Sequence, residues 1–182
     1  MKHLINFLTW FRVISGPAIF ILILIFNQYG TSLVLFIMAS LSDYFDGYLA
    51  RRYNCESSFG EVLDPIADKI LTLFLILTLT LFFQSYFIGF IGALILSREF
   101  WVSALRDMNA RQGNVSSTEV SLAAKCKTSL QFIAFASYLI GIFLGNALLI
   151  FLSDFVLFAA FIITIYTGSL YTMNSFQLRK TH

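Results

Sequence analysis

Apolar residues run along this chain in six long stretches separated by short polar interruptions. The stretches cover approximately residues 4–26, 31–50, 62–83, 86–105, 121–145 and 147–173. A helix needs roughly 20 mostly apolar residues to cross the ~30 Å hydrocarbon core of a bilayer. The pattern therefore predicts an all-α integral membrane protein with six transmembrane helices.

The polar interruptions differ in charge, which predicts the orientation of the chain. Residues 27–30, 84–85 and 145–146 contain no Lys or Arg, whereas all 12 basic residues lie on the opposite side or in the helix ends that lead to it. Because Lys and Arg concentrate in cytoplasmic loops, we predict that both termini are cytoplasmic. Among the acidic residues only Asp154 lies towards the other side. Any chemistry should therefore take place at the cytoplasmic surface.

Composition excludes an ordinary water-soluble domain. The chain has 182 residues, of which 58% are hydrophobic and 12% charged, whereas a soluble domain has about 25% charged residues. Little chain remains outside the helices, so we treat residues 1–182 as a single membrane domain. The formal net charge of +2 gives no support for a nucleic-acid partner.

Aspartates gather at the cytoplasmic ends of the second and third predicted helices. Asp43 and Asp46 lie in one helix, and Asp64 and Asp68 lie one turn apart in the other. Each pair shares one helix face, and a short connection would make the two helices antiparallel neighbours. The carboxylates then converge, where desolvation and mutual repulsion both oppose their charge. They require a positively charged partner.

Two explanations for that partner are open. Three neighbouring bases could neutralise the aspartates in a structural belt of ion pairs: Arg51, Arg52 and Lys69. The alternative is divalent cations, because carboxylates without His or Cys suit Mg²⁺ or Mn²⁺, which leave coordination positions to substrate phosphates. Small residues on the same faces favour this second explanation by leaving room for a ligand near the backbone: Gly47, Ala50 and Gly60.

The spacing of these residues is diagnostic. Asp43-x2-Asp46-Gly47-x2-Ala50-Arg51-x8-Gly60-x3-Asp64-x3-Asp68 matches the signature of the CDP-alcohol phosphotransferase family at every fixed position, and the chain resembles that family along its whole length. The resemblance implies that the four aspartates hold two divalent metal ions, Mg²⁺ or Mn²⁺, on the diphosphate of a CDP-linked donor. It also implies that Asp68 acts as the general base.

The same resemblance implies contacts to the CDP moiety of the donor. They come from the first helix and from the aspartate motif: Asn6, Thr9, Arg12, Gly47, Ala50, Arg51, Ser57 and Gly60. The first three also fit a structural role as polar residues at the interfacial start of a helix, and that alternative stays open. The membrane setting fits CDP-diacylglycerol, whose acyl tails would stay in the lipid.

A second polar cluster bears on the acceptor. The run Arg98-Glu99-Phe100-x-Val102-Ser103-x-Leu105-Arg106 is followed by Lys125-x-Lys127-Thr128. Because Arg and Lys suit a phosphate monoester, we predict that Arg98, Arg106 and Lys125 bind the acceptor's phosphate. The rule that cytoplasmic ends are basic would also explain these residues without any substrate.

The run resembles the phosphatidylglycerophosphate synthase branch of the family, whose acceptor is sn-glycerol 3-phosphate. Phosphatidylinositol phosphate synthase, whose acceptor is also a phosphate ester, and other phosphatidyltransferases that use CDP-diacylglycerol remain alternatives. Outside enzymes, a divalent-cation transporter could use intramembrane carboxylates. A transporter should also carry ionisable groups through the outer half of the membrane, where the sequence places only Asp154.

Two glycines four residues apart bear on how the helices associate. Gly141-x3-Gly145 would let two helices approach closely, either between two copies or within one chain. The resemblance suggests a homodimer. We expect the chain in a bacterial inner membrane, with its active site facing the cytoplasm and membrane lipid around it.

Overall fold

The computed structural model describes residues 2–53, 58–111 and 122–180, with side chains described for residues 7–42, 63–110 and 127–176. These residues form six helices: α1 (Lys2–Leu24), α2 (Tyr29–Tyr53), α3 (Ser58–Phe83), α4 (Tyr86–Arg111), α5 (Leu122–Leu144) and α6 (Ala147–Lys180). The predicted all-α class is confirmed for the described part of the chain.

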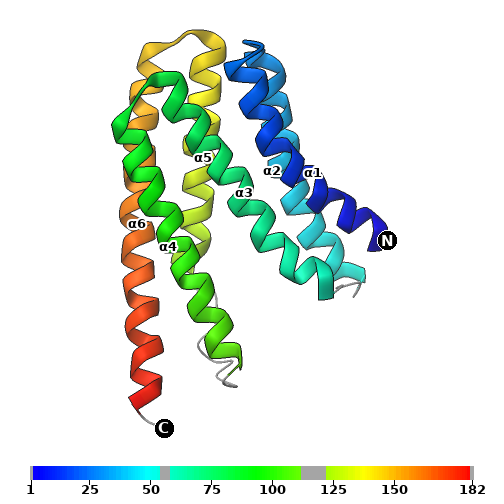
Figure 1. Ribbon diagram of the computed structural model, residues 1–182, viewed down its shortest axis with the longest axis vertical. Coiled ribbons are helices and arrows are strands. Elements are labelled where there is room, and N and C mark those ends of the chain that lie inside the picture. Colours follow the sequence, from blue (N-terminus) through cyan, green and yellow to red (C-terminus); the bar gives the residue numbers. More distant parts are fainter. Residues whose placement is uncertain (1, 54–57, 112–121, 181–182) are drawn as a thin grey trace.

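The three tight connections lie where the sequence predicts them, at one end of the bundle (Figure 1). Asn27, Gln84 and Gly145 each adopt positive φ angles, of 54°, 50° and 63°. This left-handed conformation ends a helix and is least costly for Gly. The next helix can then begin at once, since the side chain of Asn146 accepts a hydrogen bond from the backbone N–H of Leu149 at 3.2 Å.

Five of the six helices are long and apolar enough to cross a membrane, namely α1, α3, α4, α5 and α6. The described apolar segment of α2 is shorter and covers Tyr29–Ser42. Several helices also continue past their apolar stretches: α4 ends at Arg111 and α6 at Lys180, whereas the apolar stretches end near residues 105 and 173. Apolar length reports the bilayer crossing, while the backbone can remain helical beyond it.

Helix α1 packs against the two helices that carry the motif aspartates. It lies against both α2 and α3, whereas α4 lies against α3 and α6, and α5 against α2 and α6 (Figure 1). The expectation that the second and third helices are direct neighbours is not met in the described part of the chain, where α1 packs on both of them and α2 and α3 share no extensive contact. The side chains of α1 can reach the aspartates of α3.

The buried core is mostly apolar and lies between these helices. Ile19 and Ile23 of α1 meet Leu71, Leu75 and Leu79 of α3 among the fully or almost fully buried side chains. Many large apolar side chains on the outer faces are exposed, as expected for a protein surrounded by lipid.

The Gly141-x3-Gly145 pattern is explained within one chain. A Cβ atom at Gly141 would lie 2.8 Å from Cγ1 of Ile150, so glycine allows α5 and α6 to approach closely. Gly145 supplies the positive φ angle that ends α5. Both glycines therefore serve the α5–α6 hairpin.

Candidate active site

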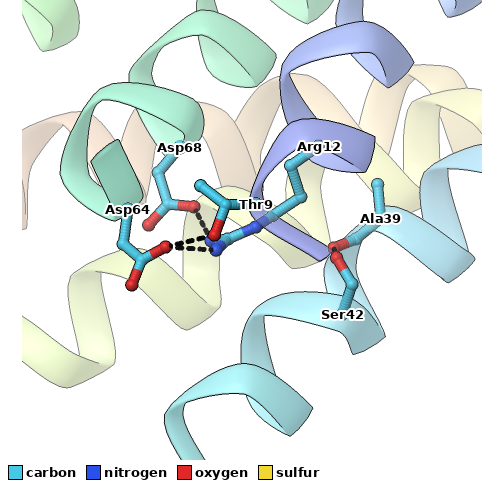
Figure 2. A network of polar contacts seen from close by, with 6 residues as sticks. All are labelled: Thr9, Arg12, Ala39, Ser42, Asp64 and Asp68. Carbon is cyan, nitrogen blue, oxygen red and sulfur yellow. Dashed lines mark hydrogen bonds and ion pairs between the residues drawn. The ribbon is translucent and has the colours of Figure 1, made fainter. Parts of the chain in front are cut away.

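Arg12 of α1 binds two of the motif aspartates of α3 (Figure 2). Its Nη1 donates to Oδ1 of Asp68 at 2.5 Å, and its Nη2 donates to Oδ1 of Asp64 at 3.2 Å. Thr9 lies one turn earlier on α1 and donates its hydroxyl to the same Oδ1 of Asp64 at 2.7 Å. The two residues of each helix face the other helix together, since residues three or four apart share a helix face.

The burial of these groups is uneven. The Arg12 side chain is 0% exposed, whereas those of Asp64 and Asp68 are 36% and 38% exposed. A buried guanidinium needs paired carboxylates to offset the cost of desolvation. The aspartates thus pair with the buried Arg12 while part of each aspartate side chain remains exposed. Figure 2 shows the second oxygen of Asp64 directed away from Arg12.

The chemistry of these donors fits a divalent cation. Asp64 and Asp68 offer hard carboxylate oxygens one helical turn apart, and both are partly exposed. Within the residues whose side chains are described, no group of three or more His, Cys, Asp or Glu is close enough to hold a metal ion. The side chains of Asp43 and Asp46 lie outside that part of the chain. The described carboxylates therefore provide part of a possible site.

The ammonium group of Lys69 is directed to α4, although it is near enough to Asp68 to interact with it electrostatically. Its Nζ donates to Oγ of Ser103 at 2.6 Å and lies 5.2 Å from the ring centroid of Phe100, both on α4. Arg12 is the base that forms ion pairs with both Asp64 and Asp68 among the described side chains. The side chains of Arg51 and Arg52 lie outside the described set.

A pocket of about 220 Å³ opens between α3, α4 and α5 beside this cluster. Asp68 belongs to both the Arg12 cluster and the pocket wall. The other charged or amide-bearing side chains of the wall are Lys69, Arg98, Glu99, Arg106, Lys127 and Gln131. With four bases and two acids among these residues, the pocket has an excess of positive charge and suits an anion.

Hydrogen bonding inside this pocket is incomplete. Lys127 donates to Oε1 of Glu99 at 2.8 Å, where the two side chains are 10% and 14% exposed. In contrast, Nε of Arg98, Nε of Arg106 and Nε2 of Gln131 are buried and have no hydrogen-bond partner among the described residues. Each unsatisfied buried donor costs about 1–3 kcal/mol.

The structure brings together six of the residues that the sequence singles out. Thr9 and Arg12 meet Asp64 and Asp68, and the pocket joins Asp68 to Arg98 and Arg106. For the others, either the side chain or the whole residue is outside the described set: Asn6, Asp43, Asp46, Gly47, Ala50, Arg51, Ser57, Gly60 and Lys125. Those predictions are not tested.

The pocket also contains residues that the sequence did not assign to the acceptor site. Lys69, Lys127 and Gln131 line it, whereas the sequence pointed to Lys125. The spacing of Lys127 and Gln131 was a usable signal, because residues four apart lie on one helix face. Nothing in the sequence indicated that this face of α5 turns towards Arg98.

Comparison with known proteins identifies the family. The family model described as CDP-alcohol phosphatidyltransferase matches residues 2–168. A Rickettsia typhi protein named CDP-diacylglycerol--glycerol-3-phosphate 3-phosphatidyltransferase is 40% identical over 185 residues, which cover 100% of this chain and 99% of that protein.

Other proteins of that name are similar to this chain over most of their length. The Rickettsia prowazekii protein is 39% identical over 184 residues, covering 100% of this chain and 97% of the relative. The Escherichia coli K12 protein is 39% identical over 132 residues, covering 71% and 72%. With the aspartate motif, its ion-paired geometry and these matches taken together, the chain belongs to the CDP-alcohol phosphatidyltransferase family.

Proposed function

We propose that this chain transfers the phosphatidyl group of CDP-diacylglycerol to sn-glycerol 3-phosphate, giving phosphatidylglycerophosphate and CMP. The observation that carries this proposal is the position of Asp68, which lies in the wall of a basic pocket and in the aspartate cluster at the same time. A pocket for a phosphorylated acceptor thus adjoins the motif that the family uses for its donor. The names of the relatives describe the same reaction.

The donor side of the site would be formed by the four motif aspartates. Ala39 and Ser42 are buried on the side of α2 beside Arg12 (Figure 2). We expect Asp43 and Asp46 on that same face, because residues one helical turn apart share a face. Two Mg²⁺ or Mn²⁺ ions bound there would neutralise the diphosphate and make the attacked phosphorus more electrophilic.

Residues of this chain would orient the donor and its carboxylates. Arg12 and Thr9 fix Oδ1 of Asp64, which limits how that carboxylate can turn. We assign the CDP moiety to the residues that the family resemblance indicates: Asn6, Thr9, Arg12, Gly47, Ala50, Arg51, Ser57 and Gly60. The diacylglycerol tails would remain in the surrounding lipid.

The acceptor would enter the pocket between α3, α4 and α5 with its phosphate on the basic side chains. Arg98 and Arg106 line that pocket, and Lys125 completes the set that the sequence indicates. Asp68 takes the proton of the acceptor hydroxyl. The hydroxyl oxygen bonds to the phosphorus that bears diacylglycerol, the bond from that phosphorus to the diphosphate bridging oxygen breaks, and CMP leaves with the electron pair.

The acceptor is tested by supplying several in parallel. Purified protein in vesicles would receive CDP-diacylglycerol with glycerol 3-phosphate, inositol phosphate, serine or phosphatidylglycerol, and CMP release would be measured. We expect rapid release with glycerol 3-phosphate alone. Faster release with inositol phosphate would instead favour the phosphatidylinositol phosphate synthase alternative.

For the topology, we propose six membrane crossings with both termini in the cytoplasm, because Gln84 and Asn146 lie in turns without Lys or Arg. Cysteines replacing Ser85 and Asn146, in a chain whose Cys55 and Cys126 are substituted, should react with an impermeant thiol reagent added to intact cells. Protection of both positions until the membrane is opened would reverse the orientation.

Removal of divalent metal should abolish activity, since Asp43, Asp46 and Asp64 offer hard oxygen ligands. We expect CMP release to fall to background in excess EDTA and to return when Mg²⁺ or Mn²⁺ is added back above the chelator. Full turnover in EDTA would remove the metal ions from the proposal.

We further propose that residues 1–182 act as one membrane domain of a bacterial inner-membrane enzyme, with the active site facing the cytoplasm and two copies forming a homodimer. Bacterial relatives support the location. Because Gly141 already packs against Ile150 of the same chain, the dimer interface would be formed by other residues. The mass of the detergent-solubilised particle, corrected for bound detergent, distinguishes one copy from two.

A further inference from the structure

Helix α6 supports the side chain of Arg98 from behind. Nη2 of Arg98 donates to Oγ1 of Thr167 at 2.7 Å. That hydroxyl also lies 2.8 Å from the backbone oxygen of Ile163 and donates to it. Because its single hydrogen is used by its own helix, Oγ1 presents lone pairs to Arg98 and can act there only as an acceptor. The hydrogen bond therefore runs from Arg98 to Thr167, and it fixes where the Arg98 guanidinium lies.

The neighbouring glycine gives the Arg98 side chain its path across α6. A Cβ atom at Gly168 would lie 2.5 Å from Nε and 2.9 Å from Cγ of Arg98. Contacts this short require Arg98 to move. Gly168 is itself buried in the helix. Thr167 thus orients the guanidinium, and Gly168 provides the space in which it lies.

The second arginine of the pocket also rests on α6. The guanidinium carbon of Arg106 lies 5.6 Å from the ring centroid of Tyr171, within the range of a cation–π contact. The hydroxyl of Tyr171 is buried and has no hydrogen-bond partner among the described residues. The aromatic ring is therefore the part of Tyr171 that contacts Arg106.

We propose that Thr167, Gly168 and Tyr171 are positioning residues for the acceptor site, because they fix the arginines that bind the acceptor's phosphate. None of the three lines the pocket. They act on the substrate only through Arg98 and Arg106. This inference rests on the proposed function, and it adds the α6 surface 167–171 as a determinant of acceptor affinity.

The first test is the valine variant of Thr167, which keeps the side-chain shape and removes the hydroxyl. We expect Thr167→Val to raise KM for glycerol 3-phosphate by roughly 5- to 30-fold. This corresponds to losing part of the contribution of one hydrogen bond to a charged group. KM for CDP-diacylglycerol and kcat should stay within about twofold. Thr167→Ser, which restores the acceptor oxygen, should recover most of the affinity.

A matched control lies one turn earlier on α6. Thr164 is also fully buried, but its hydroxyl has no hydrogen-bond partner among the described residues. Thr164→Val therefore makes the same chemical change without touching Arg98, and it should leave both KM values unchanged. If it raises KM for glycerol 3-phosphate as much as Thr167→Val does, the effect belongs to packing of α6 and the proposal is wrong.

A double-mutant cycle tests whether Thr167 acts through Arg98. In an Arg98→Ala background, Thr167→Val should have no further effect on KM for glycerol 3-phosphate, because the group that it orients is gone. Fully additive effects would overturn the positioning role while leaving the proposed function intact. If the unmodified protein does not use glycerol 3-phosphate at all, the proposed function fails, and this inference fails with it.

Gly168 and Tyr171 provide independent checks. Gly168→Ala should raise KM for glycerol 3-phosphate by at least as much as Thr167→Val. Gly141→Ala is the matched control, because it introduces a close contact with Ile150, which is not a pocket residue. It should lower thermal stability without raising this KM.

Tyr171→Leu should raise KM for glycerol 3-phosphate by about 2- to 10-fold, and Tyr171→Phe, which keeps the ring, should not. Equal effects of the two Tyr171 variants would contradict the ring's role.

Discussion

Turnover with glycerol 3-phosphate is expected to fall by about 10²- to 10⁴-fold when Asp68 is replaced by asparagine, the usual contribution of a general base. The side chain is 38% exposed and lines the basic pocket in which we propose that the acceptor binds, so it could meet the acceptor hydroxyl. Asparagine retains a carbonyl oxygen but cannot take the proton. Binding of CDP-diacylglycerol should survive better than turnover does.

Asp43→Asn gives the comparison that separates a base from a ligand. It should weaken metal and donor binding together, because it removes charge where the metal ions would bridge the diphosphate. Donor affinity and single-turnover rate would be measured for both variants. If Asp68→Asn loses donor binding as fully as Asp43→Asn while its single-turnover rate at saturation stays normal, Asp68 is only a ligand and the base lies elsewhere.

The second large effect is expected at Arg12. Arg12→Met removes the buried cation from between Asp64 and Asp68 and leaves the two carboxylates to repel each other. We expect the metal-free protein to lose about 1–3 kcal/mol of stability, less than for a fully buried pair because the carboxylates reach solvent. Turnover should fall at least tenfold, because the orientation of Asp68 is lost.

Divalent metal provides the diagnostic readout for this variant. A bound cation would replace the missing positive charge, so Mn²⁺ should raise the thermal unfolding temperature of Arg12→Met by more than it raises that of the unmodified protein. Arg12→Lys retains the charge but lacks the two guanidinium nitrogens that bond both aspartates, so its shift in unfolding temperature should lie between the other two. An equal response to Mn²⁺ in all three proteins would show that Arg12 does not compensate the charge of the two carboxylates that we propose as metal ligands.

The helices and their turns were predictable from the sequence, because apolar length and turn chemistry are local properties. Asn27 and Gly145 end helices where the polar interruptions predicted turns. The helix ends on the aspartate side were less predictable. α6 continues to Lys180, since its polar residues beyond position 173 are compatible with helix but carry no apolar signal.

The site was only partly predictable, because its contacts join helices far apart in sequence. The Asp64–Asp68 spacing placed two carboxylates on one face, yet the partner that neutralises them, Arg12, is more than 50 residues away. Sequence proximity suggested Arg51, Arg52 and Lys69 as the neutralising bases instead. That lysine extends to Ser103 of α4, a direction that depends on how α3 and α4 pack.

The role of α6 lay beyond sequence reasoning for the same physical reason. Thr167 and Gly168 are ordinary residues of an apolar helix, and neither carries charge or belongs to the aspartate motif. Only the packing of α4 on α6 brings them to Arg98. Local patterns therefore identified the chemistry, and tertiary packing determined which residues support it.

The most direct measurement of the central claim is the stoichiometry of a single reaction. Purified protein in vesicles containing CDP-diacylglycerol would receive divalent metal and glycerol 3-phosphate labelled in its carbon atoms. CMP and lipid-soluble label should appear in equal molar amounts, with the label in phosphatidylglycerophosphate. Release of CMP without transfer of label into lipid would contradict the central claim, because the donor would then be hydrolysed and not used to form the new phosphodiester.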